Sequence, residues 1–284
     1  MLLSIGDRVQ TGRFKLHSRF DRVVNFTNDG QLVSLVEEEI GAGPLNLVIN
    51  NINLGEIRLL AIERQIIFLG PWRFHIDNKL IYHSDLDFVH FNIETFRNNL
   101  IVLEKIFIET APSKSLAFLL EESRREHFHS RFERAYVRQI SKGVQKLFNG
   151  NWISGVKMLK GCGFGLTPGG DDFIAGVLIG LNFIQKMLGR DCRRHIKTIY
   201  AAARGGNIFS NTFLYLAKEG LLFESMKSLI ASLLYGTEKE IRQCTKRLFS
   251  IGGSSGADLG VGFFMTVRAA LYSLAVNKGE VIWL

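Results

Sequence analysis

The residues of this chain best suited to do chemistry lie in one glycine-rich stretch, 161–172, which reads GCGFGLTPGGDD. Five glycines, one threonine and two adjacent aspartates precede an apolar helical stretch. Glycine lets backbone N–H groups approach a ligand, and a helix start offers unpaired donors with partial positive charge. The stretch therefore predicts a site for a small anionic or amide ligand. Asp171 and Asp172 could equally satisfy the helix start, because aspartate is favoured in a first turn.

A second stretch, 251–262, reads IGGSSGADLGVG and repeats this arrangement ahead of another apolar helix. Neither stretch has the spacing of a P-loop or of a Rossmann dinucleotide motif. Two unrelated turns would have no reason to share this composition, so we expect both loops to line one pocket. Phosphate or carboxylate binding is assigned to the backbone and hydroxyl groups of Ser254, Ser255 and Gly256.

At these residues the sequence resembles the AllH-like family of unknown function, which includes a subunit associated with oxamate carbamoyltransferase in anaerobic allantoin breakdown. The family pattern reads approximately Gly-x-Gly-x-Gly-Leu-Thr-Pro-Ser-Gly-Asp-Asp, then Ser-x-Thr, then Gly-x-Ser-Ser-Gly-x-Asp. These blocks fall here at 161–172, 210–212 and 252–258, and the resemblance covers mainly residues 145–275. Gly169 stands where the family has serine. A ligand contact made by that hydroxyl must therefore come from elsewhere in this chain or be absent.

The resemblance implies carbamoyl chemistry in purine catabolism, in which oxalurate and phosphate give oxamate and carbamoyl phosphate, or the reverse. The chain would be a carbamoyltransferase or a subunit of one, with partner subunits and no cofactor. Such a reaction needs donors for phosphate, stabilisation of an oxyanion, and an acceptor for amide N–H groups. We assign Asp171, Asp172 and Asp258 to orienting an amide or acting as base. The expected substrate contacts are Gly165, Thr167, Gly169, Gly170, Arg204 as an anion clamp, Ser210, Asn211, Thr212, Ser254, Ser255 and Gly256.

Two alternatives to carbamoyl transfer stay open. The three aspartates could bind Mg²⁺ in a metal-dependent hydrolase or phosphotransferase, because hard cations prefer oxygen ligands. Alternatively, the chain could be a non-catalytic subunit whose loops bind a ligand and whose basic helix is an interface. The sequence contains no HExxH or CxxC motif, and we expect no bound metal. Whether the chain is itself an enzyme is open on the sequence alone.

Composition describes a soluble globular protein of 284 residues, with 46% hydrophobic and 22% charged residues. No signal peptide is recognisable, and the longest uncharged apolar run, 173–185, is too short to span a bilayer. Three widely separated cysteines argue against a disulfide framework and for a reducing compartment. We therefore expect a cytoplasmic protein that does not bind membranes.

The formal charge of +8 includes a basic stripe on one predicted helix, 130–148. Its basic residues recur at helical spacing opposite an apolar stripe, which indicates an amphipathic helix with a solvated outer face. Aromatic residues do not interleave with the charges, so the pattern of a nucleic-acid groove is missing. The basic residues are Arg131, Arg134, Arg138 and Lys142, and the apolar ones are Phe132, Tyr136, Ile140, Val144 and Leu147.

The pattern of the chain changes near residue 90 and predicts an α+β fold. Residues 1–92 are β-rich and predict a small antiparallel sheet or partly closed barrel. Residues 93–284 are mainly helical and carry both glycine loops, and the closing residues 280–284 suggest one more strand. Gly176 and Gly180 would let another helix approach closely, and Ser210 would cap a helix. We find no internal repeat. Strands are expected at 13–20, 22–27, 31–36, 45–48, 57–60, 65–68 and 72–76, and helix starts near 113, 130, 170, 190, 210, 223, 237 and 254.

Overall fold

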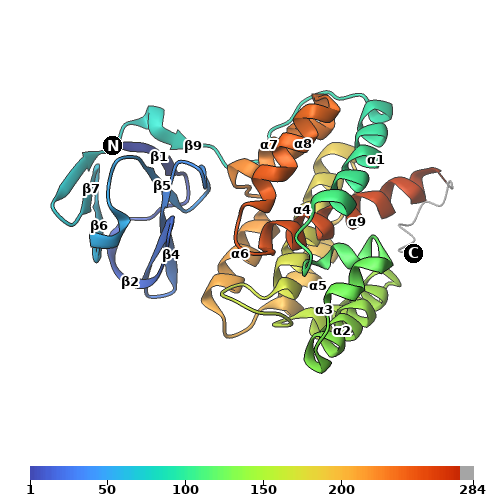
Figure 1. Cartoon of the computed structure of the whole chain (residues 1–284). Coiled ribbons are helices and arrows are strands. Elements are labelled where there is room, and N and C mark those ends of the chain that lie inside the picture. Colours follow the sequence, from blue (N-terminus) through green and yellow to red (C-terminus); the bar gives the residue numbers. More distant parts are fainter. Residues whose placement is uncertain (276–284) are drawn as a thin grey trace. The chain divides into compact units, whose positions relative to one another are not determined.

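The computed structural model describes residues 1–275, and these form two compact units. The first comprises Met1–Asp85 together with Leu221–Glu224, and the second comprises Leu86–Gly220 and the described residues from Ser225 onward. The first unit is built on strands and the second on helices (Figure 1), which confirms the expected α+β fold. A division of the chain at residue 92 remains a proposal.

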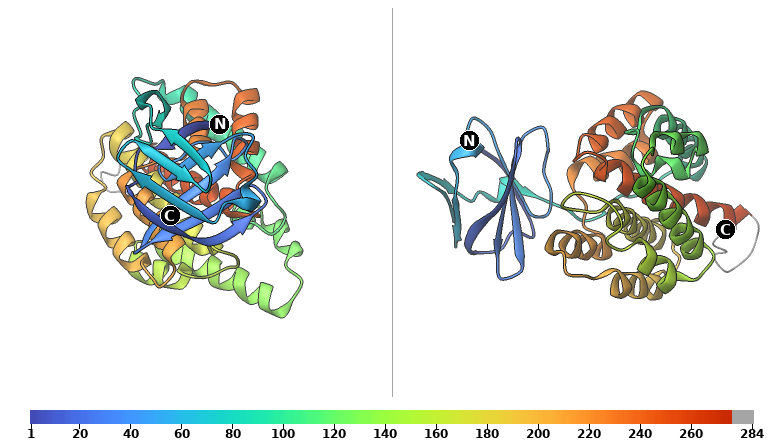
Figure 2. Two further views of the ribbon diagram at one scale, coloured as in Figure 1. Left: turned by 90° about the vertical axis from the view of Figure 1, so that its left-hand side faces the viewer. Right: turned by 60° about the horizontal axis from the view of Figure 1, so that its bottom comes forward.

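The first unit is a curled sheet of nine strands in the order β8-β7-β6-β2-β3-β4-β5-β1-β9 (Figure 2). Neighbouring strands are antiparallel except for the pairs β4–β5 and β1–β9. Seven strands follow the β-prone runs of the sequence, whereas β1 and β9 were not expected. The strands are β1 (Leu2–Gly6), β2 (Gly12–Phe20), β3 (Val23–Asn28), β4 (Gln31–Glu37), β5 (Asn46–Ile49), β6 (Leu59–Glu63), β7 (Ile66–Leu69), β8 (Trp72–His75) and β9 (Ile81–Tyr82).

Alternating apolar residues of the strands make the core of this unit. Phe14, Phe26, Leu35, Leu47 and Leu60 are all fully buried members of one hydrophobic cluster. Burying such side chains stabilises the sheet by about 1.5–3 kcal/mol each. The alternation therefore fixes the register, because a shift by one residue would turn these side chains to the opposite face.

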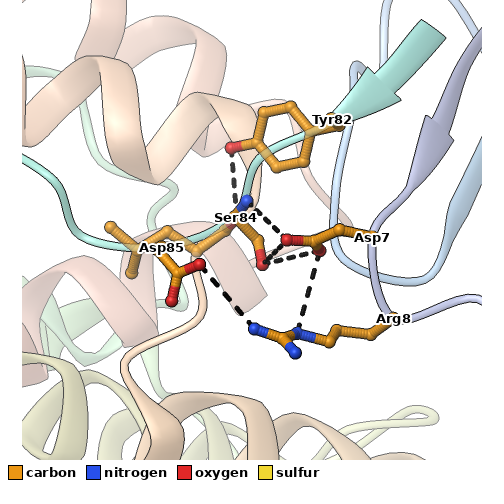
Figure 3. Close-up of polar contacts among 6 residues, drawn as sticks. Asp7, Arg8, Tyr82, Ser84 and Asp85 are labelled. Atoms are coloured by element: carbon orange, nitrogen blue, oxygen red, sulfur yellow. Dashed lines mark hydrogen bonds and ion pairs between the residues drawn. The ribbon is translucent and has the colours of Figure 1, made fainter. Parts of the chain in front are cut away.

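A polar cluster around Asp7 ties the end of the strand region back to β1 (Figure 3). The Asp7 carboxylate accepts hydrogen bonds from the Ser84 N–H group at 3.0 Å and from the Ser84 hydroxyl at 2.8 Å. The guanidinium group of Arg8 lies 4.0 Å from the carboxylate of Asp7 and 3.7 Å from the carboxylate of Asp85. Ser84 is fully buried, so these bonds supply the partners that its polar groups would otherwise lack.

The segment Leu221–Glu224 belongs to the strand unit through bonds to its main chain. The Leu222 N–H donates to the Ser84 carbonyl at 2.8 Å, and the Tyr82 hydroxyl donates to the Leu222 carbonyl at 3.1 Å. Glu224 accepts a bond from the N–H of Ala42 at 2.8 Å. A stretch that follows the sixth helix therefore completes a unit formed mainly by the first 85 residues.

The second unit is built around α4, which is buried along nearly its whole length. None of the described helices is long and apolar enough to cross a membrane. The helices are α1 (Ile93–Thr110), α2 (Arg131–Phe148), α3 (Trp152–Leu159), α4 (Gly169–Leu188), α5 (Arg193–Ala203), α6 (Ile208–Glu219), α7 (Glu224–Tyr235), α8 (Glu238–Phe249) and α9 (Ser255–Ala275), with the short 3₁₀ segments η3 (Leu116–Leu119) and η4 (Glu122–His127). The 3₁₀ segments η1 (Leu54–Glu56) and η2 (Asn78–Leu80) lie in the first unit.

Most helix starts lie close to those expected, with four differences. The start expected near 113 is the 3₁₀ segment η3, and neither α1 nor α3 was among the expected starts. The helix expected to be capped by Ser210 begins earlier, at Ile208, because the Asn207 side chain accepts bonds from the N–H groups of Phe209 and Ser210. The strand expected at 280–284 lies outside the described residues.

Helices α4 and α9 contact each other through their backbones. A Cβ atom built on Gly176 would lie 2.0 Å from the carbonyl oxygen of Leu259. Reciprocally, a Cβ atom on Gly262 would lie 2.2 Å from the carbonyl oxygen of Phe173. Only glycine fits at either position, and the prediction that Gly176 admits a second helix is confirmed.

The contacts also fix the direction of the two helices. Phe173, near the N-terminal end of α4, contacts Gly262 of α9. Further along both helices, a Cβ atom built on Gly180 of α4 would lie 2.8 Å from the Thr266 side chain of α9. Residue numbers rise together in α4 and α9, so the helices run parallel. Their N-terminal ends, and the glycine loops that precede them, therefore lie at the same end of the pair.

Replacement of Gly176 by alanine should destabilise the protein. Alanine normally gains about 1 kcal/mol over glycine in a helix, but here its Cβ would overlap a backbone carbonyl oxygen that cannot move independently. We expect a net loss of about 1–3 kcal/mol in the free energy of unfolding, measured by denaturant titration. Gly206→Ala is the control, because a Cβ there meets nothing within 4 Å. Equal stability of the two variants would contradict the close helix contact.

Candidate functional site

The two glycine loops meet directly at the N-terminal ends of α4 and α9. The hydroxyl oxygens of Thr167 and Ser255 lie 3.1 Å apart, although 88 residues separate them in the chain. The Thr167 hydroxyl also donates to the carboxyl of Asp172 at 3.2 Å. Ser255 hydrogen-bonds the same carboxyl group. Residues from both loops thus converge on Asp172.

The two loops are also built from equivalent backbone turns, which their shared composition alone did not establish. Each follows a helix that ends near a leucine whose carbonyl accepts a turn hydrogen bond. The N–H of Cys162 donates to the carbonyl of Leu159 at 2.9 Å, and the N–H of Ile251 donates to the carbonyl of Leu248 at 3.2 Å. The segments that enter α4 and α9 therefore begin with equivalent turns.

The second residue of each following helix is a glycine with the same surroundings. The N–H of Gly170 donates to the Cys162 carbonyl at 2.8 Å, and the N–H of Gly256 donates to the Ile251 carbonyl at 3.2 Å. A Cβ atom would lie 2.0 Å from the preceding leucine carbonyl at Gly170 and 1.9 Å at Gly256. Each glycine thus lets its helix start against the end of the helix before it.

Asp172 and Asp258 occupy equivalent positions, the fourth residue of α4 and of α9. Asp258 is 1% exposed, and its two carboxyl oxygens accept bonds from the N–H of Leu116 at 2.6 Å and from the Ser254 hydroxyl at 2.9 Å. Asp172 is 7% exposed. The equivalent turns therefore place one buried carboxyl group at the start of each helix.

Burial governs the protonation of this pair. It raises the pKa of the Asp258 carboxyl to about 7. Burial first, and then the charge of Asp258, raises the pKa of Asp172 well above its usual value. A helix N-terminus favours a carboxylate by only about 0.3–1 kcal/mol, whereas removing a charge from water costs several. Burial therefore disfavours the state in which both acids are ionised, and a partly protonated pair can both donate and accept hydrogen bonds.

Asp171 faces its own loop. Its carboxylate accepts a bond from the N–H of Gly161 at 2.7 Å, which closes the turn after α3. The side chain is 5% exposed. Of the three aspartates assigned to chemistry by the sequence, Asp171 thus holds its own loop in shape. Asp172 instead accepts bonds from hydroxyl groups of both loops, and Asp258 accepts one from a hydroxyl group of the second loop.

The segment after α5 lies beside the first loop. The Asn207 amide donates to the Leu166 carbonyl at 2.7 Å. Asn211 exchanges two bonds with the main chain of Gly205, at 2.9 and 2.7 Å. Lys160, which sequence reasoning missed although it directly precedes Gly161, donates to the carbonyl of Arg204. These contacts place the Lys160 ammonium group and the main chain of Arg204 at the edge of the first glycine loop.

The remaining predicted contacts differ in their surroundings. The Arg204 side chain is exposed, and so is Gly165. The Ser210 hydroxyl is buried and has no hydrogen-bond partner among the described residues. Thr212 lies in α6 without a recorded bond to either loop within residues 1–275. The structure therefore brings Thr167, Gly169, Gly170 and the second loop together and links 204–211 to their edge.

Several backbone donors in the loops are unused. In the described part of the chain, the N–H groups from Gly163 to Thr167 and from Gly252 to Ser255 donate to no acceptor. Gly163 has a φ of +138°, and a Cβ there would lie 2.4 Å from the N atom of Gly169, so this turn requires glycine. Such runs of free N–H groups at helix starts bind anions.

Tyr136 of α2 also reaches the site, and sequence reasoning placed it in an apolar stripe. A Cβ atom built on Gly169 would lie 2.8 Å from the Tyr136 hydroxyl and 2.7 Å from an Asp258 carboxyl oxygen. Both polar atoms therefore face the same point at the start of α4. No group of three His, Cys, Asp or Glu side chains within residues 1–275 is placed to hold a metal ion.

The pKa of Asp258 predicts how stability changes with pH. Its value of about 7 exceeds the usual 3.8, so the folded chain binds this proton more tightly than the unfolded chain. Stability should therefore fall as the pH rises from about 4 to about 7. Asp258→Asn lacks this ionisable group, so its free energy of unfolding should decrease less with pH than that of the parent, by up to about 4 kcal/mol. Denaturant titration at pH 4 and pH 8 measures it, and an equal loss in the parent and the variant would contradict the assignment.

Comparison with known proteins covers most of the described chain. Residues 2–87 match the AllH family N-terminal domain, and residues 159–267 match the family described as oxamate carbamoyltransferase subunit AllH. A protein zwilch homolog of Danio rerio is 29% identical over 150 residues, which are 50% of this chain and 24% of that protein. The match thus spans about a quarter of that relative's length, and no solved structure matches the chain significantly. The chain belongs to the AllH family, whose name describes a subunit of oxamate carbamoyltransferase.

Proposed function

We propose that this chain is the oxamate carbamoyltransferase subunit that binds the substrates, at the N-terminal ends of α4 and α9, and that carbamoyl transfer takes place there. The observation that carries this proposal is the contact between Thr167 and Ser255, which joins the two loops beside a buried pair of acids. Partner subunits complete the enzyme, as the family name implies.

The loops offer the groups that an anionic substrate requires. The free N–H groups at 163–167 and 252–255 can surround the oxygens of phosphate or of a carboxylate. Lys160 and Arg204 lie at the edge of the first loop and supply positive charge. The raised pKa values of the acid pair disfavour full ionisation and so reduce the repulsion that two carboxylates would exert on an anion.

The acid pair fits the proton movements of carbamoyl transfer. In the proposed reaction, a phosphate oxygen attacks the ureido carbon of oxalurate and forms a C–O bond. The C–N bond to the oxamate nitrogen breaks, and that nitrogen gains the proton lost from the attacking phosphate. An ionised carboxylate can accept the first proton and a protonated carboxyl can donate the second. Asp172 and Asp258 are assigned these roles jointly.

The remaining assigned groups support these steps. Free N–H groups of the loops stabilise the negative charge that develops on the carbonyl oxygen of the ureido group. Asp171 acts indirectly, because its bond to Gly161 holds the loop in shape. The Mg²⁺-dependent and non-catalytic alternatives are separated from this proposal by the experiments below.

Ser255→Ala should weaken phosphate binding about 3- to 10-fold, which corresponds to the loss of about 1 kcal/mol of hydrogen bonding. The hydroxyl contacts Thr167 and Asp172, so its loss loosens the junction of the loops. The measurement is calorimetric titration of the full chain with inorganic phosphate. The control is a double replacement, Arg134→Ala with Arg138→Ala, on the exposed face of α2. Loss of binding in the control alone would place the anion site on the basic face.

Asp172→Asn should abolish carbamoyl-phosphate formation from oxalurate and phosphate while the protein stays folded. The amide preserves hydrogen bonding to Thr167 but cannot release or accept the proton. Thermal melting and an activity assay with partner subunits present separate the two effects. Retained activity would assign Asp172 a structural role, and activity that EDTA removes would favour the Mg²⁺ alternative. Full turnover by the partner subunits without this chain would favour the non-catalytic one.

A further inference from the structure

The hydroxyl of Tyr136 faces the candidate site, and the proposed function gives it no role. We infer that Tyr136 is a substrate-binding residue that donates its hydroxyl to the amide oxygen of an oxamate-like ligand, while Asp258 accepts an amide N–H. This inference rests on the proposed function, because it names the ligand group held at one part of the same site.

The position of the hydroxyl is the first support. The Tyr136 side chain is 7% exposed, and its hydroxyl comes within 2.8 Å of the point where a side chain at Gly169 would begin. An oxygen of Asp258 lies 2.7 Å from the same point. Within residues 1–275 the hydroxyl has no hydrogen-bond partner. The phenol ring is therefore buried, while its hydroxyl is left open to a ligand beside a buried acid.

The equivalence of the two loops accounts for the position of this hydroxyl. Gly169 is the first residue of α4, as Ser255 is the first residue of α9. Ser255 places a hydroxyl against the acid of the opposite helix, Asp172. Gly169 has no hydroxyl to place against Asp258, and the phenol from α2 reaches that position instead. Tyr136 thus makes the two acids of the pair different from each other.

The chemistry of a phenol restricts what it can bind. Burial first, and then the charge of Asp258, raises the pKa of Tyr136 above its usual value of 10. The hydroxyl therefore remains protonated and can donate to a ligand oxygen. An acceptor of N–H bonds lies beside it in Asp258. A donor and an acceptor side by side match the carbonyl and N–H groups of a primary amide.

An aromatic edge adjoins this point. The ring of Phe164 lies 6.1 Å from that of Tyr136 and 5.5 Å from that of Phe132, and its side chain is 62% exposed. Phe164 stands in the first glycine loop, next to the unused N–H groups. A flat amide held by Tyr136 would therefore have an apolar surface beside it and the anion-binding donors within the same loop.

The test compares Tyr136→Phe with the parent and with Tyr272→Phe, which removes an exposed hydroxyl on α9. Each full chain is titrated calorimetrically with oxamate and, separately, with inorganic phosphate. We expect Tyr136→Phe to bind oxamate about 3- to 10-fold more weakly, with phosphate binding unchanged. Tyr272→Phe should match the parent for both ligands.

Each other outcome overturns a defined part of the argument. Unchanged oxamate binding by Tyr136→Phe overturns the role of the hydroxyl and leaves the proposed function intact. An equal loss of oxamate and phosphate binding shows that Tyr136 only supports the fold of the site, which also overturns the inference. Failure of the parent chain itself to bind oxamate overturns the proposal that this chain binds the substrates, and this inference with it.

Discussion

The architecture of the candidate site depends on the backbone contact between α4 and α9. Gly176 and Gly262 remove the side chains that would keep the helices apart, so each meets a carbonyl oxygen of the other helix. Because the helices run parallel, this contact brings two N-terminal ends together. Segments that are about 85 residues apart in the chain thereby supply hydroxyl groups, free N–H groups and carboxyl groups to one place.

This arrangement places two positively polarised helix ends side by side, and a buried carboxyl group lies at each of them. Two parallel helices present two partial positive charges at the same end, and a carboxyl group in the first turn of each is a favourable neighbour. Full ionisation of both acids would place like charges close together away from water, which burial penalises more strongly. The raised pKa values of Asp172 and Asp258 express this conflict, because they disfavour the state in which both acids are ionised. The same constraint that stabilises the fold thus creates groups suited to acid and base chemistry.

The sequence predicted the parts of the site that depend on local composition. Glycines, aspartates and hydroxyls in two stretches indicated the loops, and the spacing of Gly176 and Gly180 indicated the close helix. It did not predict that the loops are equivalent, because the first is longer and few residues match. Tyr136 was hidden in the apolar stripe of α2, since a residue that packs and a residue that points a polar end at a site have the same periodicity. Only the tertiary structure shows that the Tyr136 hydroxyl faces the site.

The equivalence of the two loops is limited to their backbones. The polar partners of Asp172 and Asp258 differ, and this difference has the greater chemical consequence. Asp172 is bonded by the hydroxyls of Thr167 and Ser255, whereas Asp258 has the N–H of Leu116 and the hydroxyl of Ser254. Acids in identical surroundings would have the same intrinsic affinity for a shared proton. Unlike surroundings instead separate the tendency of each to hold a proton, which is how one site assigns an acid and a base. In the proposed reaction, a symmetric pair of helices with unsymmetric partners thus supplies both a rigid frame and a direction for proton movement.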